Sequence, residues 1–230
     1  MHIRSLSSLV VSAWLLSGNA AAQVEKIATE SFDYNYPGLL INNNGGSGWA
    51  SAWDVIQNGN EVVIFQNNGQ HPPFGGDDGI GNFAGQGQEY GQAFRVLDTT
   101  GQDDVTEGGK FGRDSATIWI TFDTRTFQQF GDHYGGLSLY DGTIEHFFIG
   151  SPWGTYAWGL DDVNGNGPVV IPGTDDELDA KLVCRLAYLP GQERARRWHN
   201  PTTAYPKDSP DVALMLPDHR FDRIRLSAGG

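Results

Sequence analysis

Residues 116–124 read ATIWITFDT and alternate in chemical character along their whole length. Every second residue, Ile118, Ile120 and Phe122, falls on one side of an extended chain, and the intervening residues fall on the other. Aromatic and β-branched residues in such an alternation are typical of a strand with one buried face. We therefore predict a β-strand over 116–124.

Similar alternation in other segments predicts a chain made of many short strands. The clearest are 136–140, 181–188 and 223–226, and weaker candidates are 27–33, 50–56, 61–66, 93–97, 144–149, 156–160, 194–199 and 212–216. The chain has 31 glycines, and they gather with Asn and Asp in clusters that favour turns. The only helix-like piece is 175–180, and residues 67–92 are expected to form a long surface loop. The pattern predicts an all-β sandwich or barrel.

The N-terminus has the organisation of an export signal. A short basic start ending at Arg4 precedes a mostly apolar run over 5–18, and three alanines at 20–22 precede Gln23. The apolar run is short for a membrane span, and the alternative is an uncleaved anchor. We predict a signal peptide over 1–22, a single domain over 23–230, no membrane insertion after cleavage, and a secreted, periplasmic or cell-surface location.

Charge and cysteine content restrict the partners and the way the fold is held. The formal net charge is −13, which argues against nucleic acid and anionic membranes and is compatible with calcium or neutral glycans. Cys184 is the single cysteine, so no intramolecular disulfide can form. Because it alternates with Leu182 and Leu186, we predict a buried structural thiol.

Several sequence blocks, in order along the chain, resemble the secreted LamG-like, concanavalin-A-like jelly-roll proteins of bacteria. The blocks are ESFDY (30–34), NGGSGW (44–49) with Trp53, GGLSLYDG (135–142) with FIG (148–150), WGL (158–160), LVCR (182–185) with Trp198 and NP (200–201), and FDRIRL (221–226). The resemblance implies an antiparallel two-sheet jelly roll with minimal helix outside the signal peptide. Such chains usually continue past the last block with another strand, which leaves two alternatives here, an unpaired edge strand or a truncated sequence.

One segment has partial calcium-loop spacing. Asp162, Asn164 and Asn166 occupy positions 1, 3 and 5 of a D-x-N-x-N-G loop, and Asp161 adds a carboxylate. Position 12 is Gly173 instead of a bidentate glutamate, so any binding would be weak. The alternative is a hairpin turn between 158–160 and 169–171, because Asn-Gly favours hairpins.

Three neighbouring aromatic residues suggest a contact surface for sugars. Trp153, Tyr156 and Trp158 lie close in sequence, and period two places Tyr156 and Trp158 on one strand face. Sugars stack on exposed rings and bond to nearby polar groups. The alternative is that these rings fill the core, as we expect for Trp49, Trp53 and Trp119.

No local motif indicates catalysis. The paired strand carboxylates of jelly-roll glycosidases, a G-x-S-x-G nucleophile motif and zinc-type histidine spacings are all absent from the sequence. The basic cluster over 194–197 is interpreted as protection of an exposed strand edge, with contact to acidic polysaccharide as the alternative.

We therefore expect a secreted, non-catalytic recognition or adhesion module for extracellular glycan, with calcium as a possible support and no assigned catalytic residues. This expectation follows from the resemblance and from the polar loops. Two alternatives stay open, a polysaccharide-degrading hydrolase or lyase on the same scaffold, and a purely structural matrix or envelope protein.

Overall fold

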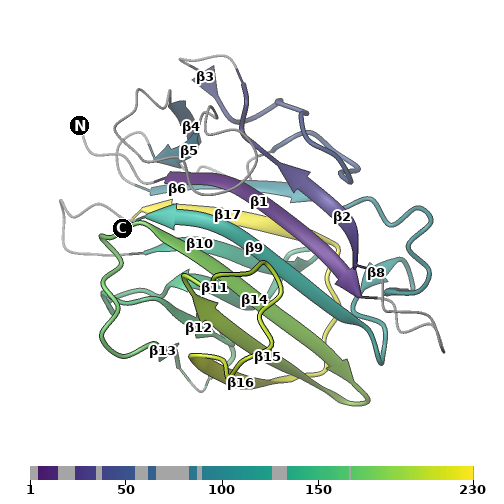
Figure 1. The fold of residues 1–230 in the computed structure, drawn as a ribbon. Coiled ribbons are helices and arrows are strands. Elements are labelled where there is room, and N and C mark those ends of the chain that lie inside the picture. Colours follow the sequence, from purple (N-terminus) through teal and green to yellow (C-terminus); the bar gives the residue numbers. More distant parts are fainter. Residues whose placement is uncertain are drawn as a thin grey trace.

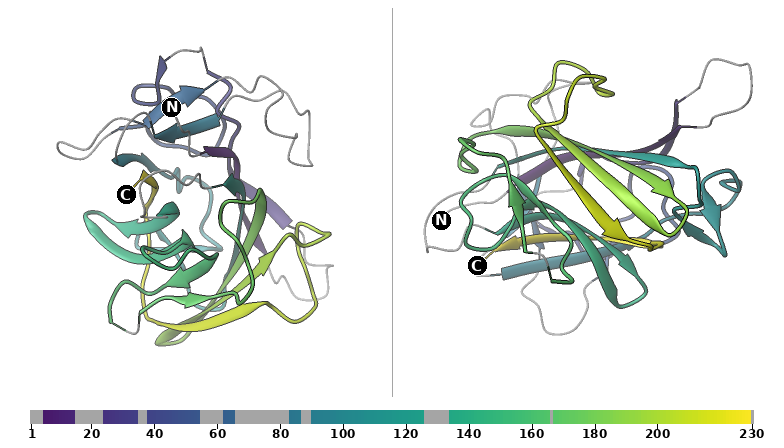
Figure 2. Two further views of the ribbon diagram at one scale, coloured as in Figure 1. Left: turned by 90° about the vertical axis from the view of Figure 1, so that its left-hand side faces the viewer. Right: turned by 90° about the horizontal axis from the view of Figure 1, so that it is seen from below.

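The computed structural model describes residues 5–14, 24–34, 38–54, 62–65, 83–86, 90–125, 134–165 and 167–229. Within these ranges every regular element is a β-strand (Figure 1). Two large antiparallel sheets pack face to face as the two layers seen in Figure 2. The prediction of an all-β, two-sheet sandwich is confirmed, and the arrangement is consistent with a jelly roll. No helix in the described part of the chain is long and apolar enough to cross a bilayer.

Among the described residues, the first sheet has nine strands. Its path runs β16-β15-β14-β9-β1-β5-β4-β3, and β2 also pairs with β1. The strands are β1 (Ser5–Trp14), β2 (Val24–Glu30), β3 (Gly38–Leu39), β4 (Val62–Phe65), β5 (Phe83–Gln86), β9 (Thr117–Arg125), β14 (Ala180–Leu189), β15 (Gln192–His199) and β16 (Val212–Pro217).

The second sheet, in the part of the chain that the structure describes, has six strands in the order β13-β12-β11-β10-β17-β6. They are β6 (Tyr90–Val96), β10 (Gly135–Asp141), β11 (Ile144–Ser151), β12 (Gly159–Asp161), β13 (Val169–Val170) and β17 (Arg223–Gly229). A separate hairpin joins β7 (Thr106–Glu107) to β8 (Lys110–Phe111). Strand β17 pairs with β10 on one side and β6 on the other, so the last described strand lies inside its sheet.

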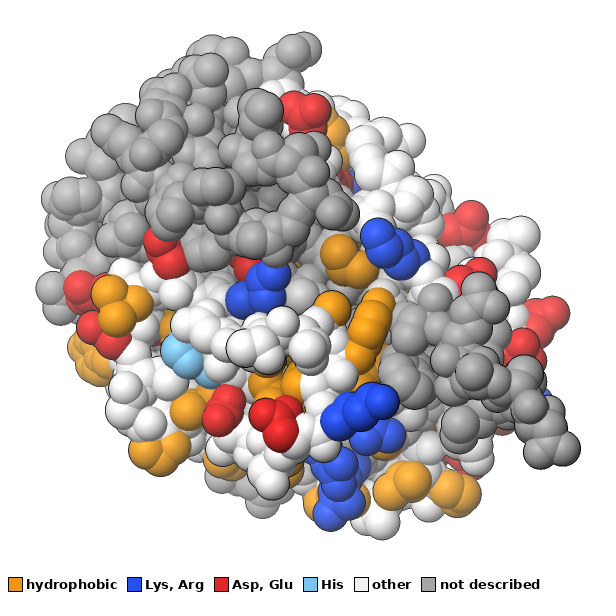
Figure 3. All heavy atoms as spheres, viewed as in Figure 1, with side chains coloured by type: hydrophobic (Ala, Val, Ile, Leu, Met, Phe, Trp, Pro, Cys, Tyr) orange, Lys and Arg blue, Asp and Glu red, His pale blue; other side chains and the backbone are white. Residues whose placement is uncertain are grey.

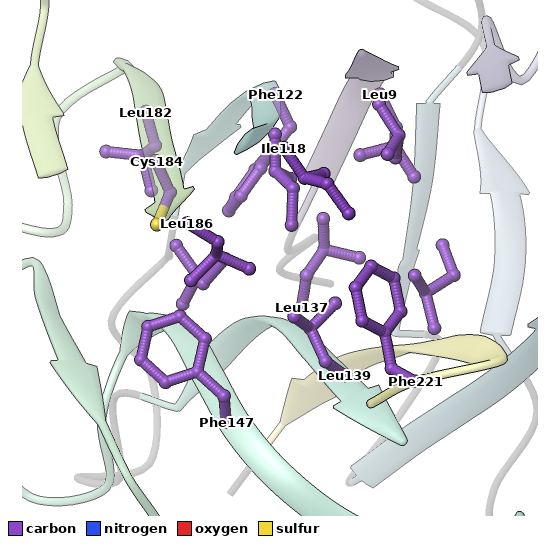
Figure 4. Close-up of a cluster of buried hydrophobic side chains, with 14 of the residues drawn as sticks. Leu9, Ile118, Phe122, Leu137, Leu139, Phe147, Leu182, Cys184, Leu186 and Phe221 are labelled. Atoms are coloured by element: carbon purple, nitrogen blue, oxygen red, sulfur yellow. The ribbon is translucent and has the colours of Figure 1, made fainter. Parts of the chain in front are cut away.

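The core lies between the sheets and is built by alternation along the strands. Ile118 and Phe122 of β9 point toward Leu137 and Leu139 of β10, and all four are fully buried (Figure 4). Cys184 lies in the same layer, also fully buried, and burial raises the pKa of its thiol to about 12. The prediction of a structural thiol is confirmed, because a desolvated thiol stays neutral and packs as a small apolar group.

A buried ion pair fixes the segment that follows β2 to the second sheet. Arg95 donates hydrogen bonds to Glu30 and, at 2.8 Å, to Asn44 Oδ1, and it stacks on Trp49 with 4.7 Å from Cζ to the ring centroid. Tyr34 Oη also donates to Glu30 Oε2 at 2.7 Å. Apart from Arg95, which belongs to β6, these residues come from the ESFDY and NGGSGW blocks, and the contacts satisfy the buried charges. The blocks therefore serve the fold directly.

Residues 5–14, which lie within the predicted signal peptide, form strand β1. It pairs with β9 from Ser5 to Trp14 and with β2 from Leu9 to Trp14, antiparallel in both cases. The expectation of minimal helix outside the signal peptide is confirmed, since every described regular element is a strand. The segment itself is a central strand, a conformation that its β-branched Val10 and Val11 favour. Cleavage of the leader stays a prediction.

Three smaller expectations are corrected by the structure. The stretch 175–180 forms turns and the start of β14, so it is not helical. Strand β5 and the start of β6 lie within the expected loop over 67–92, so that segment is not loop throughout. Its other residues lie outside the described part of the chain. Strand β15 pairs with both β14 and β16, so the basic residues over 194–197 do not protect a sheet edge.

Candidate functional site

The predicted aromatic residues lie on the loop that joins β11 to β12. Thr155 closes a turn there, since its backbone N and its Oγ1 both donate to Pro152 O, at 3.2 and 2.8 Å. Tyr156 follows with a φ of 53°, a left-handed conformation that interrupts the extended chain. The predicted strand over 156–160 therefore begins only at Gly159.

The aromatic side chains before and after the left-handed turn at Tyr156 lie in different environments. Trp153 is 68 % exposed and Tyr156 is 48 % exposed, whereas Trp158 is completely buried in the main core. The period-two expectation that Tyr156 and Trp158 share one face is wrong, because the chain is not extended at Tyr156. The ring of Trp158 is not accessible to a ligand, and only Trp153 and Tyr156 form a candidate surface, called here the aromatic loop.

A second loop, over 172–178, supports the aromatic loop from behind. Trp158 N donates to Thr174 Oγ1 at 3.1 Å, and Ser151 Oγ donates to the buried carboxylate of Asp176 at 2.5 Å. Leu178 on this second loop is 62 % exposed and adds apolar surface. Hydrogen bonds at Ser151 and Trp158 thus fix both ends of the aromatic loop, on which the Trp153 and Tyr156 rings are exposed.

The side chains predicted to hold calcium form a hairpin turn between β12 and β13. Asp161 Oδ1 accepts a hydrogen bond from Val163 N at 3.0 Å, and Asp162 Oδ1 accepts one from Asn164 N at 3.2 Å. Asp162 is almost completely buried. The hairpin alternative is thus present, with Leu160 opposite Val169. The fourth predicted ligand, Asn166, lies outside the described residues.

The hairpin turn offers few free oxygens to a cation. In the described part of the chain, no group of three or more His, Cys, Asp or Glu side chains could hold a metal ion. Each of the two described carboxylates already accepts a backbone N–H, a use that stabilises the turn by itself. Calcium binding here would need ligands beyond the side chains that the structure brings together.

A buried polar cluster at one end of the sandwich was not predicted. Tyr188 and Glu193 face each other across the β14–β15 hairpin, and the His219 ring centroid lies 5.9 Å from that of Tyr188. His219 N donates to Glu193 Oε1 at 3.1 Å. Tyr188 Oη, Glu193 Oε2 and His219 Nε2 are buried and have no hydrogen-bond partner among the described residues.

Burial controls the ionisation of this cluster. Desolvation raises the pKa of Glu193 to about 7 and lowers the pKa of His219 to about 4. Both shifts disfavour the charged form, as expected for groups removed from water. No signal in the sequence pointed to Glu193, because its burial depends on Tyr188 across the hairpin and on His219, which lies far along the chain.

A second unpredicted network lies on the outward face of the six-stranded sheet. Arg225 donates to Glu145 Oε1 at 2.6 Å and to Ser138 Oγ at 3.1 Å, and its Cζ lies 4.8 Å from the Tyr140 ring centroid. Tyr140 Oη donates to the other oxygen of Glu145 at 2.8 Å. Both carboxylate oxygens are engaged, so Glu145 is held as a structural partner of Arg225.

Basic side chains gather on the outward face of the nine-stranded sheet. Arg185 lies directly opposite Arg196 across β14 and β15, with Arg194 two residues further along β15. Figure 3 shows Lys and Arg side chains over the part of this face where these strands lie in Figure 1. In the described structure these three arginines form no ion pair. Burial and the neighbouring charges of Arg196 and Arg194 lower the pKa of Arg185.

Comparison of the chain with protein-family models, with curated proteins and with solved structures finds no match. Function must therefore be inferred from the site itself.

Proposed function

We propose that this protein is a non-catalytic recognition module that binds a neutral extracellular glycan through the aromatic loop, Trp153 and Tyr156. The observation that carries the proposal is the exposure of Trp153, 68 % of whose surface is open to solvent. Trp153 and Tyr156 are both exposed and lie three residues apart on one loop, and exposed apolar surface of this kind is typical of interaction sites. The flat, partly polar surfaces of the two rings suit the apolar faces and hydroxyl groups of a sugar.

The surroundings of the aromatic loop favour a neutral ligand over an acidic one. Asp175 is exposed and Glu177 is half-buried on the supporting loop, and the whole chain carries a net charge of −13. Carboxylates repel an acidic polymer but accept hydrogen bonds from sugar hydroxyl groups. The rings are also held by a hydrogen-bonded loop, so little conformational entropy is lost when a ligand binds.

The sequence resemblance to LamG-like jelly rolls supports this proposal at the level of the fold, as does the two-sheet architecture. Export by the predicted signal peptide would place the module outside the cytoplasm, where polysaccharides occur. Adhesion to such a polymer is the role that we assign to it.

A hydrolytic enzyme is the second candidate, favoured by one observation. Glu193 has a pKa raised to about 7 by burial, as a general acid requires. Its side chain is completely buried, however, so a substrate cannot reach it in this conformation. A second carboxyl group at catalytic separation would also be needed. The exposed rings therefore support binding better than the buried acid supports catalysis.

A glycan array probed with the purified full chain tests the proposal. We expect binding to neutral glycans, and a loss of about tenfold or more in affinity for the variant W153A/Y156A, because each ring contributes about 1 kcal/mol of stacking. Leu189→Ala is the matched control, since Leu189 is also an exposed apolar residue but lies at the end of β14, on a different element. If the chain bound none of the glycans on the array, the proposal would be contradicted.

The same array tests calcium support when it is repeated with calcium and with a chelator. If the hairpin turn with Asp161 and Asp162 assists recognition through calcium, the retained signal will fall in chelator and return with added calcium. Equal signals in the two conditions would remove calcium from the proposal and leave the aromatic loop as the binding surface.

A further inference from the structure

Strand β1 fills a slot with hydrogen-bonding edges on both sides. Val11 pairs with Ile120 of β9 and with Ala28 of β2, and both neighbours run antiparallel to β1 (Figure 1). The slot is therefore bounded by β9 on one side and by β2 on the other, with β5 beside Leu6, and these strand edges would be unpaired without β1. Such edges bind extended peptides through main-chain hydrogen bonds.

Side-chain positions make the slot selective. Leu9 and Val11 are completely buried and lie opposite Phe122 and Ile120 of β9. On the other face Ser12 is 1 % exposed, and Tyr205 Oη donates to its Oγ at 3.5 Å. An occupant of the slot thus needs apolar side chains at the two inward positions and a small side chain at the covered outward position.

The predicted cleavage point falls between two strands of the sheet. Cleavage after Ala22 would cut the chain between the end of β1 at Trp14 and the start of β2 at Val24. All other strands would stay whole, and β1 would lose its covalent link. The chain would then hold β1 only by non-covalent contacts, or present an open slot between β9 and β2.

We propose that the slot between β9 and β2 is a strand-acceptor site for an extended partner segment with the pattern of Ser5–Trp14. The N-terminal segment of the chain occupies the site before cleavage, and a partner protein inserts a strand of the same pattern afterwards. Insertion would complete the nine-stranded sheet and bury the partner's apolar side chains in the core. This inference is independent of glycan binding, which uses the β11–β12 loop.

The test uses the full chain with its own strand disabled and a fluorescein-labelled peptide of residues 5–14. In the variant L9D/V11D the inward positions carry charges that the core cannot solvate, so β1 should leave the slot. We expect this variant to bind one wild-type peptide per chain, at least tenfold more tightly than the wild-type chain does. V10D is the control variant, because Val10 is only half-buried and its chain should keep the slot filled.

A second peptide tests whether binding depends on the apolar inward positions, and a refolding experiment covers the case in which the variant does not fold alone. The peptide that carries Asp at both inward positions should not bind to L9D/V11D. If L9D/V11D does not fold alone, refolding it with the wild-type peptide should restore the β-sheet circular-dichroism signal. The proposal is overturned if the folded variant does not bind the wild-type peptide or binds both peptides equally. It is also overturned if an unfolded L9D/V11D chain does not refold with the wild-type peptide.

Discussion

Individual buried charges in this protein are stabilised to very different degrees. Arg95 and Glu30 satisfy each other and several neighbours, so their burial is compensated. Arg197 is completely buried, donates to the carbonyl oxygen of Gly150 at 3.2 Å, and leaves Nε and one terminal nitrogen unpartnered in the described structure. Desolvation lowers the pKa of Arg197 to about 9. Arg197 also donates to the carbonyl oxygen of Gly159 and lies over the Trp158 ring, so its charge is compensated only in part, and its unsatisfied donors cost stability.

Glu193 gives the sharpest prediction at the residue scale. Its pKa is raised from the ordinary 4.5 to about 7, so the folded state binds its proton more tightly than the unfolded state does. Stability is therefore fully present below pH 4.5 and is lost as the pH rises through 7. Glu193→Gln stays neutral, so its free energy of unfolding relative to wild type should increase by on the order of 1–3 kcal/mol between pH 4.5 and 8.

Urea unfolding of both proteins at pH 4.5, 6, 7 and 8 measures this difference. His219, whose pKa is lowered to about 4, weakens both proteins as the pH falls below its ordinary value of 6.5, so its contribution largely cancels. A difference that stays constant across the four pH values would show that folding does not raise the pKa of Glu193.

Among the strands, period-two alternation predicted the long ones correctly. It failed at Tyr156 and at strand β1. The patterns over 116–124 and 181–188 correspond to β9 and β14 because each has one buried and one less buried face. Tyr156 broke the same rule, since its left-handed φ depends on the turn around Thr155 and not on residue type. Strand β1 was missed because an apolar, β-branched run satisfies both an export signal and a buried strand.

The pairing of β10 with β11 gives the prediction at this scale. Gly136 has a φ of 154°, and a Cβ placed there would lie 2.2 Å from Ile149 O on the neighbouring strand. Gly136→Ala should therefore lower the free energy of unfolding by about 2–3 kcal/mol, because backbone must move. Gly108→Ala is the control, since a Cβ there meets nothing within 4 Å and only the positive φ of 60° is strained.

Thermal and urea unfolding of the two variants separate the effects. The control should lose about 1 kcal/mol from its left-handed backbone alone. Equal losses for Gly136→Ala and Gly108→Ala would show that the close approach of β10 to β11 has no energetic cost.

For the molecule as a whole, the fold class could be predicted but the site only in part. Many short alternating segments between glycine-rich turns are sufficient for two packed sheets. The aromatic loop was found by composition, yet sequence could not separate exposed Trp153 from buried Trp158 because that depends on the path of the loop. Glu193 and Arg225 were missed because their environments are created by strands distant in sequence.

Fluorine NMR of the full chain labelled with 5-fluorotryptophan tests the recognition surface most directly. The chain has seven tryptophans, and the variant W153F assigns the Trp153 resonance. On titration with a neutral glycan retained by the array, we predict that the Trp153 resonance shifts or broadens while that of buried Trp158 does not. Binding that leaves the Trp153 resonance unchanged would contradict the assignment of the aromatic loop as the glycan-binding surface.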